Sequence, residues 1–182
     1  MYSIIRNMKK DEYSEVYQIL EDSFPATERR TRQAQQSLLN EPAYQIVVCE
    51  HEGRVGAFLA YWQLEDFLFI EHFAANPKLR NHGLGGKILQ DFLQNSQQRT
   101  VLEVEPPETE LAKRRIGFYI RNGFSLNRYG YKQPVLTEGQ QTIPLLVMSS
   151  GGELTLREFQ CFRDEVFQKV YHVGVKEGSL CL

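Results

Sequence analysis

The sequence predicts a mixed α/β (α+β) fold in which helices cover both faces of one sheet. Three observations lead to this prediction: apolar strand segments follow one another between residues 44 and 75, a strand–helix–strand unit lies in the middle of the chain, and an amphipathic helix lies near its end. The chain has 182 residues, 42% of them hydrophobic and 24% charged, as in soluble globular proteins. This length suits one domain with a core of its own.

The N-terminal part is expected to form a short strand followed by two helices. Residues 2–5 are predicted to be the strand, and Asp11 is the expected N-cap of the first helix, which Pro25 ends. A second, more polar helix is predicted over residues 28–39. Apolar residues of the first helix follow the spacing i, i+3, i+4 and i+7. They are Tyr13, Val16, Tyr17 and Leu20.

Three strands and a helix are expected next. The strands cover residues 44–49, 55–64 and 67–75, and the turn His51-Glu52-Gly53 joins the first two. A helix begins near Gly83, because apolar residues recur at helical spacing after it. These residues are Leu84, Ile88, Leu89, Phe92 and Leu93.

The remaining elements alternate between strands and helices. Strands are predicted at 100–105, 124–131 and 142–149, and a helix over 113–122 ends at Gly123. The last helix begins at a capping box, Thr155-x-x-Glu158. Its buried stripe consists of Phe159, Phe162, Val166 and Val170.

Composition and charge argue against several classes of protein. The net charge is −2, and the one dense basic cluster, residues 113–115, follows an acidic stretch, so no nucleic-acid partner is expected. No apolar run of about 18 residues exists, so no membrane span is expected. Cys49, Cys161 and Cys181 are odd in number and form no CxxC pair, which argues against metal and disulfide frameworks. The N-terminus does not resemble a signal peptide, and the expected location is the reducing cytoplasm.

Glycines are concentrated where the third strand leads into its helix, between Ala75 and Lys87. The three are Gly83, Gly85 and Gly86. Each glycine costs up to about 1 kcal/mol in a helix relative to alanine, so three together need a reason. One reason is the close approach of backbone N–H groups to a phosphate, which the helix dipole and the cations Arg80 and Lys87 also attract. The alternative is a tight turn packed closely on the sheet.

Two common phosphate-binding motifs do not fit this segment. A Walker A loop needs Ser or Thr after its lysine, but Ile88 follows Lys87. A dinucleotide fingerprint needs a third glycine where Ile88 stands. The pattern that remains is Arg-x-x-Gly-x-Gly over residues 80–85, between a strand and a helix.

That pattern resembles the pyrophosphate loop of the GNAT superfamily of acetyl-CoA-dependent N-acetyltransferases, which reads Gln/Arg-x-x-Gly-x-Gly/Ala. A second segment, Phe118-Tyr119-Ile120-Arg121-Asn122-Gly123-Phe124, resembles a later helix of that family. The resemblance covers about residues 1–149 and implies a mostly antiparallel, splayed central sheet with helices on both faces. We therefore expect a single N-acetyltransferase domain over residues 1–182, with an accessory C-terminal helix at about 153–173.

The resemblance also implies where acetyl-CoA binds. The backbone of Phe73, Ala74 and Ala75 is expected to bind the pantetheine arm, and the backbone amides of the following loop are expected to bind the pyrophosphate, with Arg80 as a flanking cation. The loop residues are Asn81, His82, Gly83, Leu84, Gly85, Gly86 and Lys87. No metal is expected.

Acetyl transfer to an amine requires loss of a proton from the amine and delivery of a proton to the leaving thiolate. Tyr119 stands where the family often has its general-acid tyrosine, so we expect it to protonate the thiolate; a core aromatic is its alternative role.

For the base the sequence suggests Glu71, because a carboxylate within an apolar strand is costly to bury unless it is paired or faces a cleft. By alternation Glu71 should share a face with Phe69 and Phe73, with His72 on the other face. A raised pKa would suit such a base. An internal ion pair is the alternative role of Glu71. The alternative bases are Glu103, Glu105 and an ordered water.

The predicted function is transfer of an acetyl group from acetyl-CoA to a primary amine of a small molecule or peptide, by direct attack in a ternary complex. The alternative is a catalytically silent module that binds or senses acyl-CoA. The expected partners are acetyl-CoA and an amine acceptor, and a homodimer is expected only if an apolar patch stays exposed. The sequence does not specify the acceptor or the length of the acyl chain.

Overall fold

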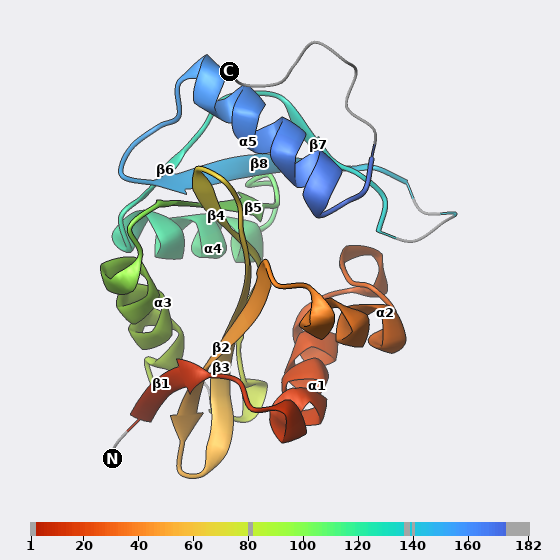
Figure 1. Cartoon of the computed structure of the whole chain (residues 1–182). Helices are drawn as coiled ribbons and strands as arrows, with labels where there is room; N and C mark the ends of the chain where they lie inside the picture. The colour runs from red at the N-terminus through yellow and green to blue at the C-terminus, as the bar shows by residue number, and fades with distance from the viewer. Residues whose placement is uncertain (1–2, 80–81, 137–138, 140, 174–182) are drawn as a thin grey trace. The chain divides into compact units, whose positions relative to one another are not determined.

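A computed structural model describes residues 3–79, 82–136, 139 and 141–173. It confirms a mixed α/β fold, and within the described residues the mostly antiparallel sheet has eight strands in the order β1-β2-β3-β4-β5-β8-β6, with β7 paired to β8 (Figure 1). The chain divides into two compact units, Met1–Gln63 with Ile70–Ser96 and Leu64–Phe69 with Gln97–Leu182. Each unit is described in turn. The single-domain organisation stays a prediction.

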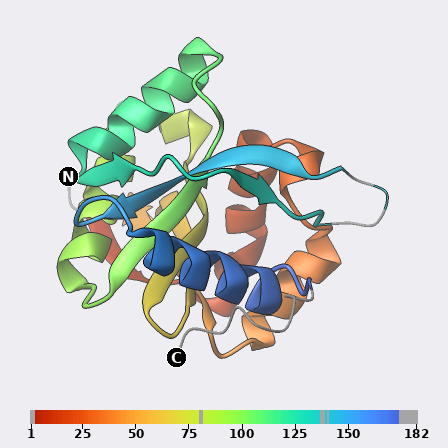
Figure 2. The same ribbon diagram turned by 90° about the horizontal axis from the view of Figure 1, so that it is seen from above.

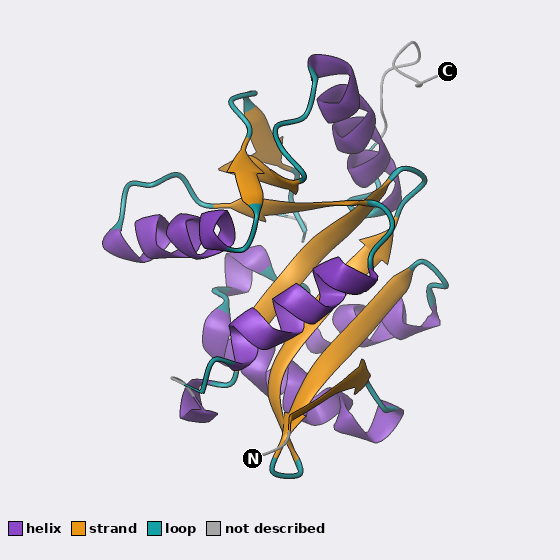
Figure 3. Cartoon of the chain, turned by 90° about the vertical axis from the view of Figure 1, so that its left-hand side faces the viewer, coloured by secondary structure: helices purple, strands orange, loops and turns teal. Residues whose placement is uncertain are grey.

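The first unit contains three helices around a set of antiparallel strands. Its elements are β1 (Ser3–Asn7), α1 (Tyr13–Ser23), α2 (Arg32–Ser37), β2 (Tyr44–His51), β3 (Arg54–Gln63), β4 (Phe67–Ala75, which begins in the second unit) and α3 (Leu84–Asn95). β2 pairs antiparallel with both β1 and β3. In Figure 1, α1 and α2 lie on one side of β2 and β3 and α3 lies on the other; Figure 3 shows α3 across the strands.

The apolar faces of the amphipathic helices are buried in the core of this unit. The predicted apolar stripe of α1 is buried, and so are Ile88 and Leu89 of α3, which are fully excluded from solvent. They pack on the strands, whose side chains Val48, Phe58 and Leu59 are at most 1% exposed. Burial of apolar surface on both faces of these strands therefore holds the three layers together.

The two N-terminal helices begin differently from the prediction. Asp11 is not a cap: residues Lys10–Glu12 form a 3-10 turn, and the Glu12 carboxylate accepts a hydrogen bond from the backbone N–H of Lys9 at 2.7 Å. α2 begins only at Arg32, because the hydroxyl of Thr31 accepts from the N–H of Ala34 at 3.3 Å and caps the helix there. A short 3-10 turn, Ala26–Glu28, occupies the beginning of the predicted helix.

The second unit is built around β8. Its elements are β5 (Arg99–Val104), α4 (Glu110–Arg121), β6 (Phe124–Leu126), β7 (Tyr131–Gln133), β8 (Ile143–Ser150) and α5 (Leu156–Lys169). β8 pairs antiparallel with β5, β6 and β7, and Figure 2 shows α5 beside β8. Phe162 of α5 is fully buried and makes edge-on ring contacts with Phe67 and Phe69.

The predicted strand over residues 124–131 is interrupted. It divides into β6 and β7, and between them lies the buried Asn127, whose backbone N–H donates to the carbonyl oxygen of Val147 of β8 at 2.9 Å. Its Nδ2 donates to the carbonyl oxygen of Val147 at 3.1 Å and its Oδ1 accepts from the N–H of Leu154 at 2.6 Å. Asn127 thereby ties the segment before α5 to β8.

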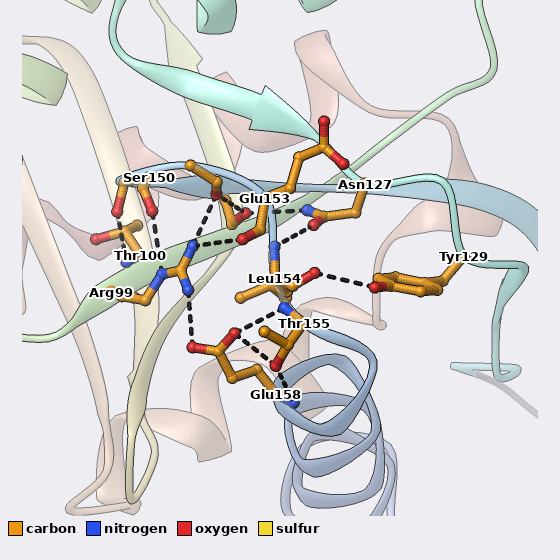
Figure 4. Close-up of polar contacts among 11 residues, drawn as sticks. Arg99, Thr100, Asn127, Tyr129, Ser150, Glu153, Leu154, Thr155 and Glu158 are labelled. Carbon is orange, nitrogen blue, oxygen red and sulfur yellow. Dashed lines mark hydrogen bonds and ion pairs between the residues drawn. The ribbon is translucent and has the colours of Figure 1, made fainter.

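The start of α5 is held by a dense set of polar contacts (Figure 4). The predicted capping box is confirmed: Thr155 Oγ1 accepts from the N–H of Glu158 at 3.3 Å, and the Glu158 carboxylate accepts from the N–H of Thr155 at 2.7 Å. Arg99 of β5 donates to the Glu158 carboxylate at 2.8 Å and to the carbonyl oxygen of Gly152 at 2.7 Å.

The cysteines differ from the sequence-based expectation. Cys161 is disulfide-bonded, whereas Cys49 is a buried free thiol. Spacing along the chain did not indicate this bond, and the cytoplasmic location stays a prediction. Among the helices of the described ranges, none combines the length and apolarity that crossing a bilayer requires.

Candidate functional site

α3 begins without a side-chain cap. Its N-cap residue is Gly83, whose φ of 68° lies in the left-handed region that glycine adopts without strain. The first N–H groups of any helix have no partner within the helix, and Gly83 has no side chain that could accept from them. The first α-helical hydrogen bond runs from the N–H of Lys87 to the carbonyl oxygen of Gly83, at 3.0 Å. The start of α3 therefore presents backbone donors and the positive end of the helix dipole.

The three glycines of this turn have different explanations. Gly83 is required by its positive φ, but Gly85 and Gly86 are ordinary helical positions. A Cβ added to Gly85 would lie 3.5 Å from Phe73 Cζ, an ordinary contact, and one added to Gly86 would have no neighbour within 4 Å. The alternative of a turn packed closely on the sheet accordingly does not explain Gly85 or Gly86. A glycine-rich first turn without a side-chain cap fits an anionic ligand.

The close packing occurs instead at Gly56 of β3, which sequence reasoning missed. A Cβ there would lie 2.5 Å from Leu84 Cδ1 and 3.2 Å from the carbonyl oxygen of Cys49. Leu84, at the first position of α3, is buried, so its side chain packs on β3 and only its backbone faces the loop. A glycine within an apolar strand was the available signal.

Asn76 fixes the corner between β4 and the loop, and it too was missed. Its N–H donates to the carbonyl oxygen of Gly56 at 2.8 Å, and its Nδ2 donates to the carbonyl oxygen of Val55 at 3.2 Å. Its Oδ1 accepts from the N–H of Lys78 at 3.0 Å. These bonds tie the exit of β4 to β3, and the Asn-Pro dipeptide that marks such turns was the available signal.

The structure places the other predicted coenzyme residues as follows. Phe73, Ala74 and Ala75 form the end of β4. The ring of His82 lies 5.2 Å from that of His51, measured between centroids. Arg80 and Asn81 lie outside the described residues.

The prediction for the amide of Lys87 needs correction. That amide already donates within α3, and the Lys87 Nζ donates to the carbonyl oxygen of Ser3 at 3.1 Å. The backbone donors at the start of α3 are therefore those of Leu84, Gly85 and Gly86, which precede Lys87 in the helix.

Glu71 is an internal ion-pair residue. Its carboxylate accepts from the guanidinium of Arg30 and from Trp62 Nε1, the latter at 2.9 Å, and its side chain is only 3% exposed. Burial acts to raise the pKa of Glu71, but the Arg30 guanidinium, His72 and the two hydrogen bonds together lower it. The expected raised pKa is therefore wrong, because Arg30 supplies a charge partner that the local sequence does not reveal.

The predicted placement of Glu71 and His72 on opposite faces of β4 stays a prediction. Both side chains contact the connection between α1 and α2: Glu71 pairs with Arg30, and the His72 Nε2 lies 3.0 Å from the carbonyl oxygen of Glu28. The His72 ring also packs edge-on against Phe24, with centroids 5.0 Å apart. Glu71 and His72 thereby both tie this connection to β4.

Tyr119 lies on α4, in the second unit. Its side chain is 7% exposed and its ring contacts Phe118 and Phe124, with centroids 5.4 and 5.6 Å away. Burial raises the pKa of Tyr119 to about 12, against an opposing effect of Arg115. The hydroxyl consequently keeps its proton at neutral pH, as a general acid requires. Its catalytic role stays a prediction.

The alternative carboxylates of β5 and the residue after it have partners as well. Glu103 accepts from the hydroxyl groups of Tyr131 and Tyr171, the latter at 2.9 Å. Glu105 accepts from Arg115 at 2.7 Å and is 40% exposed, which is typical of a surface ion pair. Within residues 3–79, 82–136, 139 and 141–173, no group of three His, Cys, Asp or Glu side chains could hold a metal ion.

Comparison with solved structures shows which proteins share the fold of this chain. The chain is similar in structure to a Bacteroides thetaiotaomicron protein named "Putative acetyltransferase from GNAT family", with 30% identity and a TM-score of 0.86, over 94% of this chain and 99% of that one. Because so much of the chain is covered, the match extends beyond residue 149. The chain also has the fold of Arabidopsis thaliana NAA60, solved in complex with acetyl-CoA, at 13% identity and a TM-score of 0.62, over 81% and 97% of the two chains.

Sequence comparison agrees. "Putative acetyltransferase YjbC" of Bacillus subtilis (strain 168) is 26% identical over 127 residues, which are 68% of this chain, and the chain spans 64% of the length of that relative. Residues 13–124, which include β4, the glycine-rich turn and Tyr119, match the model of the Acetyltransferase (GNAT) family. The chain therefore belongs to the GNAT family of acetyltransferases.

Proposed function

We propose that this protein binds acetyl-CoA at the start of α3 and transfers the acetyl group to a primary amine of a small molecule or peptide. The observation that carries the proposal is the uncapped N-terminus of α3, at a left-handed Gly83, where a Cβ at Gly86 would meet no atom of the described residues within 4 Å. Backbone N–H groups and the helix dipole favour a phosphate there. The acetyl-CoA bound to the structurally similar NAA60 supports the choice of ligand.

In this proposal, different backbone segments of the chain bind different parts of the coenzyme. The N–H groups of Leu84, Gly85 and Gly86 bind the pyrophosphate. The backbone of Phe73–Ala75, on β4, runs beside the pantetheine arm and hydrogen-bonds to its amides. Asn76 and Gly56 hold the corner between these two parts at fixed geometry through the bond from Asn76 N–H to Gly56 carbonyl oxygen.

The proposed reaction is one direct transfer in a ternary complex. The neutral amine attacks the thioester carbonyl, so that a C–N bond forms and the C–S bond breaks. The proton lost by the amine passes to a base, and the thiolate receives a proton from the hydroxyl of Tyr119. A phenol with a pKa of about 12 is protonated when the step begins, and Tyr119 regains its proton from solvent afterwards.

Glu71 is a poor candidate for the base. An alkylammonium has a pKa near ~10, far above that of an ordinary carboxylate. The Arg30 guanidinium and the other contacts of Glu71 lower the pKa of its carboxyl group, so transfer of the amine proton to Glu71 is unfavourable. We propose that water takes the amine proton and that Glu71, through Arg30, holds the α1–α2 connection on β4.

Replacing Tyr119 by Phe tests its role. We expect kcat to fall about 100-fold or more, because general-acid catalysis typically contributes 10²- to 10⁴-fold, with the Kd for acetyl-CoA unchanged. The measurement is steady-state thiol release together with calorimetric titration. As a control, Tyr129→Phe removes a hydroxyl that donates to the carbonyl oxygen of Leu154, and it should leave kcat unchanged. Equal kcat in Tyr119→Phe and the wild type would return Tyr119 to a packing role.

The overall proposal is tested by titrating the protein with acetyl-CoA, with CoA as control, and by measuring thiol release with a panel of primary amines. Micromolar binding with amine-dependent release is the expected result. Binding without release from any amine would favour the silent acyl-CoA-binding module. No binding of either ligand would contradict the assignment of the α3 start.

A further inference from the structure

A small cavity lies inside the first unit, between the helices and the strands. Its volume is about 10 Å³, and its lining comes from α1, α2, β2, β3 and β4. The lining residues are Tyr13, Val16, Tyr17, Leu20, Gln35, Tyr44, Ile46, Phe58 and His72. A volume of this size has room for one water molecule and not for a substrate side chain.

Two lining residues have a polar atom without a hydrogen-bond partner in the described part of the chain. They are Gln35 Oε1 and His72 Nδ1, and both residues are only 3% exposed. A buried polar atom left unpaired costs about 1–3 kcal/mol, so two beside one cavity need an explanation. The two residues belong to different elements, α2 and β4, so the geometry of one local turn does not explain their unpaired atoms.

The remaining atoms of both side chains decide what kind of ligand fits. Gln35 Nε2 donates to the hydroxyl of Tyr44 at 2.7 Å, which leaves Oε1 as an acceptor. The His72 Nε2 faces the carbonyl oxygen of Glu28 at 3.0 Å, a contact that requires Nε2 to carry the proton. Nδ1 of a neutral His72 is then an acceptor too. Two acceptors need a molecule that donates twice.

We propose that this cavity is a binding site for one uncharged, water-sized molecule, a structural water that donates to Gln35 Oε1 and His72 Nδ1 and thereby links α2 to β4. The hydroxyl of Tyr44, which accepts from Gln35 Nε2, can donate the third bond that a buried water commonly makes. The site lies within the helix layer and is independent of the proposed acetyl transfer.

The surroundings favour a neutral ligand over an ammonium ion. His72 lies 4.0 Å from the Glu71 carboxylate, measured from Nδ1 to Oε2, and Glu71 acts to raise the His72 pKa. Burial nevertheless keeps the pKa of His72 below its ordinary value. Since desolvation outweighs the attraction of Glu71 for the imidazolium, and Arg30 also opposes a positive charge here, the same balance acts against a bound cation.

The direct test is a crystal structure at about 1.5 Å, where ordered waters are resolved. We expect one density peak within hydrogen-bonding distance, roughly 2.7–3.2 Å, of both Gln35 Oε1 and His72 Nδ1. Density bonded to neither atom, or no density in the cavity, would overturn the proposal.

A double-mutant cycle tests the link in solution. Gln35→Leu and His72→Phe each remove one acceptor, and a shared water makes the second substitution less costly once the first is present. We expect the unfolding equilibrium constant of the double variant to differ at least fivefold from the product of the single effects. Agreement within twofold would contradict the shared water.

Gln133 provides a matched control for Gln35. It is also buried, its Nε2 donates to the hydroxyl of Tyr171 at 3.0 Å, and its Oε1 has no partner among the residues described, but it does not line this cavity. Gln133→Leu combined with His72→Phe should be additive within twofold. Coupling as strong as that of the Gln35 pair would show that the cycle reports general loosening and would overturn the water link.

The charge of the ligand can be tested separately. Exchange of potassium chloride for ammonium chloride at equal ionic strength should leave the wild-type melting temperature unchanged within about 1 °C. A stabilisation by ammonium that Gln35→Leu abolishes would contradict a neutral ligand.

Discussion

Helices α3 and α5 begin differently. The start of α5 is capped by side chains, whereas the start of α3 has no side-chain cap and is available to a ligand. At α5, the side chains of Thr155 and Glu158 accept from the backbone of the first turn, and Arg99 anchors Glu158 (Figure 4). At α3, the N-cap is Gly83, which has no side chain to accept from the first turn. The start of α5 is capped by side chains of its own chain, whereas we propose that the first N–H groups of α3 donate to an anion.

The two helix starts also differ in their glycines, which lower the stability of a helix. A helix gains up to about 1 kcal/mol when alanine replaces glycine at an unstrained interior position, yet α3 keeps Gly85 and Gly86 where no neighbouring atom forbids a Cβ. α5 has no glycine within its helix. The chain thus gives up stability at the helix start to which we assign the coenzyme.

The largest expected effect comes from placing a carboxylate in the first turn of α3. Gly86→Asp should weaken acetyl-CoA binding at least about 100-fold, because the carboxylate repels the pyrophosphate, while the melting temperature stays the same or rises, since an acid suits a helix N-terminus. Calorimetric titration and thermal unfolding measure both quantities. The matched control is Leu156→Asp, at an exposed first-turn position of α5, which should not change affinity. A Gly86→Asp protein that binds acetyl-CoA like the wild type would break the comparison.

A smaller effect, on stability and not on affinity, is expected at Arg99, which anchors the start of α5. Arg99→Met removes a guanidinium that donates to Glu158 and to the carbonyl oxygens of Ser150 and Gly152. Because hydrogen bonds to charged groups contribute about 1.5–3 kcal/mol, we expect the free energy of unfolding to fall by about 2 kcal/mol. Denaturant unfolding measures it. Affinity for acetyl-CoA should be unchanged, and a parallel loss of affinity would show that the two helix starts are not independent.

Loss of the α5 cap should cost less. Thr155→Ala removes the oxygen that accepts from the Glu158 N–H, which typically costs about 1 kcal/mol of unfolding free energy. Thr155→Ser keeps an acceptor and serves as the control, with at least half of that loss restored. If Thr155→Ala were as stable as the wild type, the capping box would not be a stabilising feature of this helix.

The smallest expected effects come from Gly86→Ala, which should change stability and affinity for acetyl-CoA in opposite directions. Gly86→Ala should raise the free energy of unfolding by up to about 1 kcal/mol, because its Cβ meets no atom within 4 Å. The same methyl group lies in the space assigned to the pyrophosphate, so the affinity for acetyl-CoA should fall. Unfolding and titration of one preparation give both numbers. A variant that gains both stability and affinity would remove the functional explanation of Gly86.

How much the sequence predicts depends on how far apart the interacting residues lie. The cap at Thr155 and the start of α3 at Gly83 depend on neighbours within one helical turn, and both predictions are confirmed. The pKa direction of Glu71 depends on Arg30, which is 41 positions away, and the prediction is wrong there. The close contact at Gly56 involves Leu84 on another element, and it was not predicted.

The central claim is that the backbone at the start of α3 binds the pyrophosphate of acetyl-CoA. The most direct measurement is a titration of ¹⁵N-labelled protein with acetyl-CoA, following the amide resonances of Leu84, Gly85 and Gly86. We predict that these three amides show the largest downfield proton shifts and saturate with the calorimetric Kd, while the amides of residues 156–158 at the start of α5 do not move. Saturable binding that leaves the three α3 amides unshifted would contradict the claim.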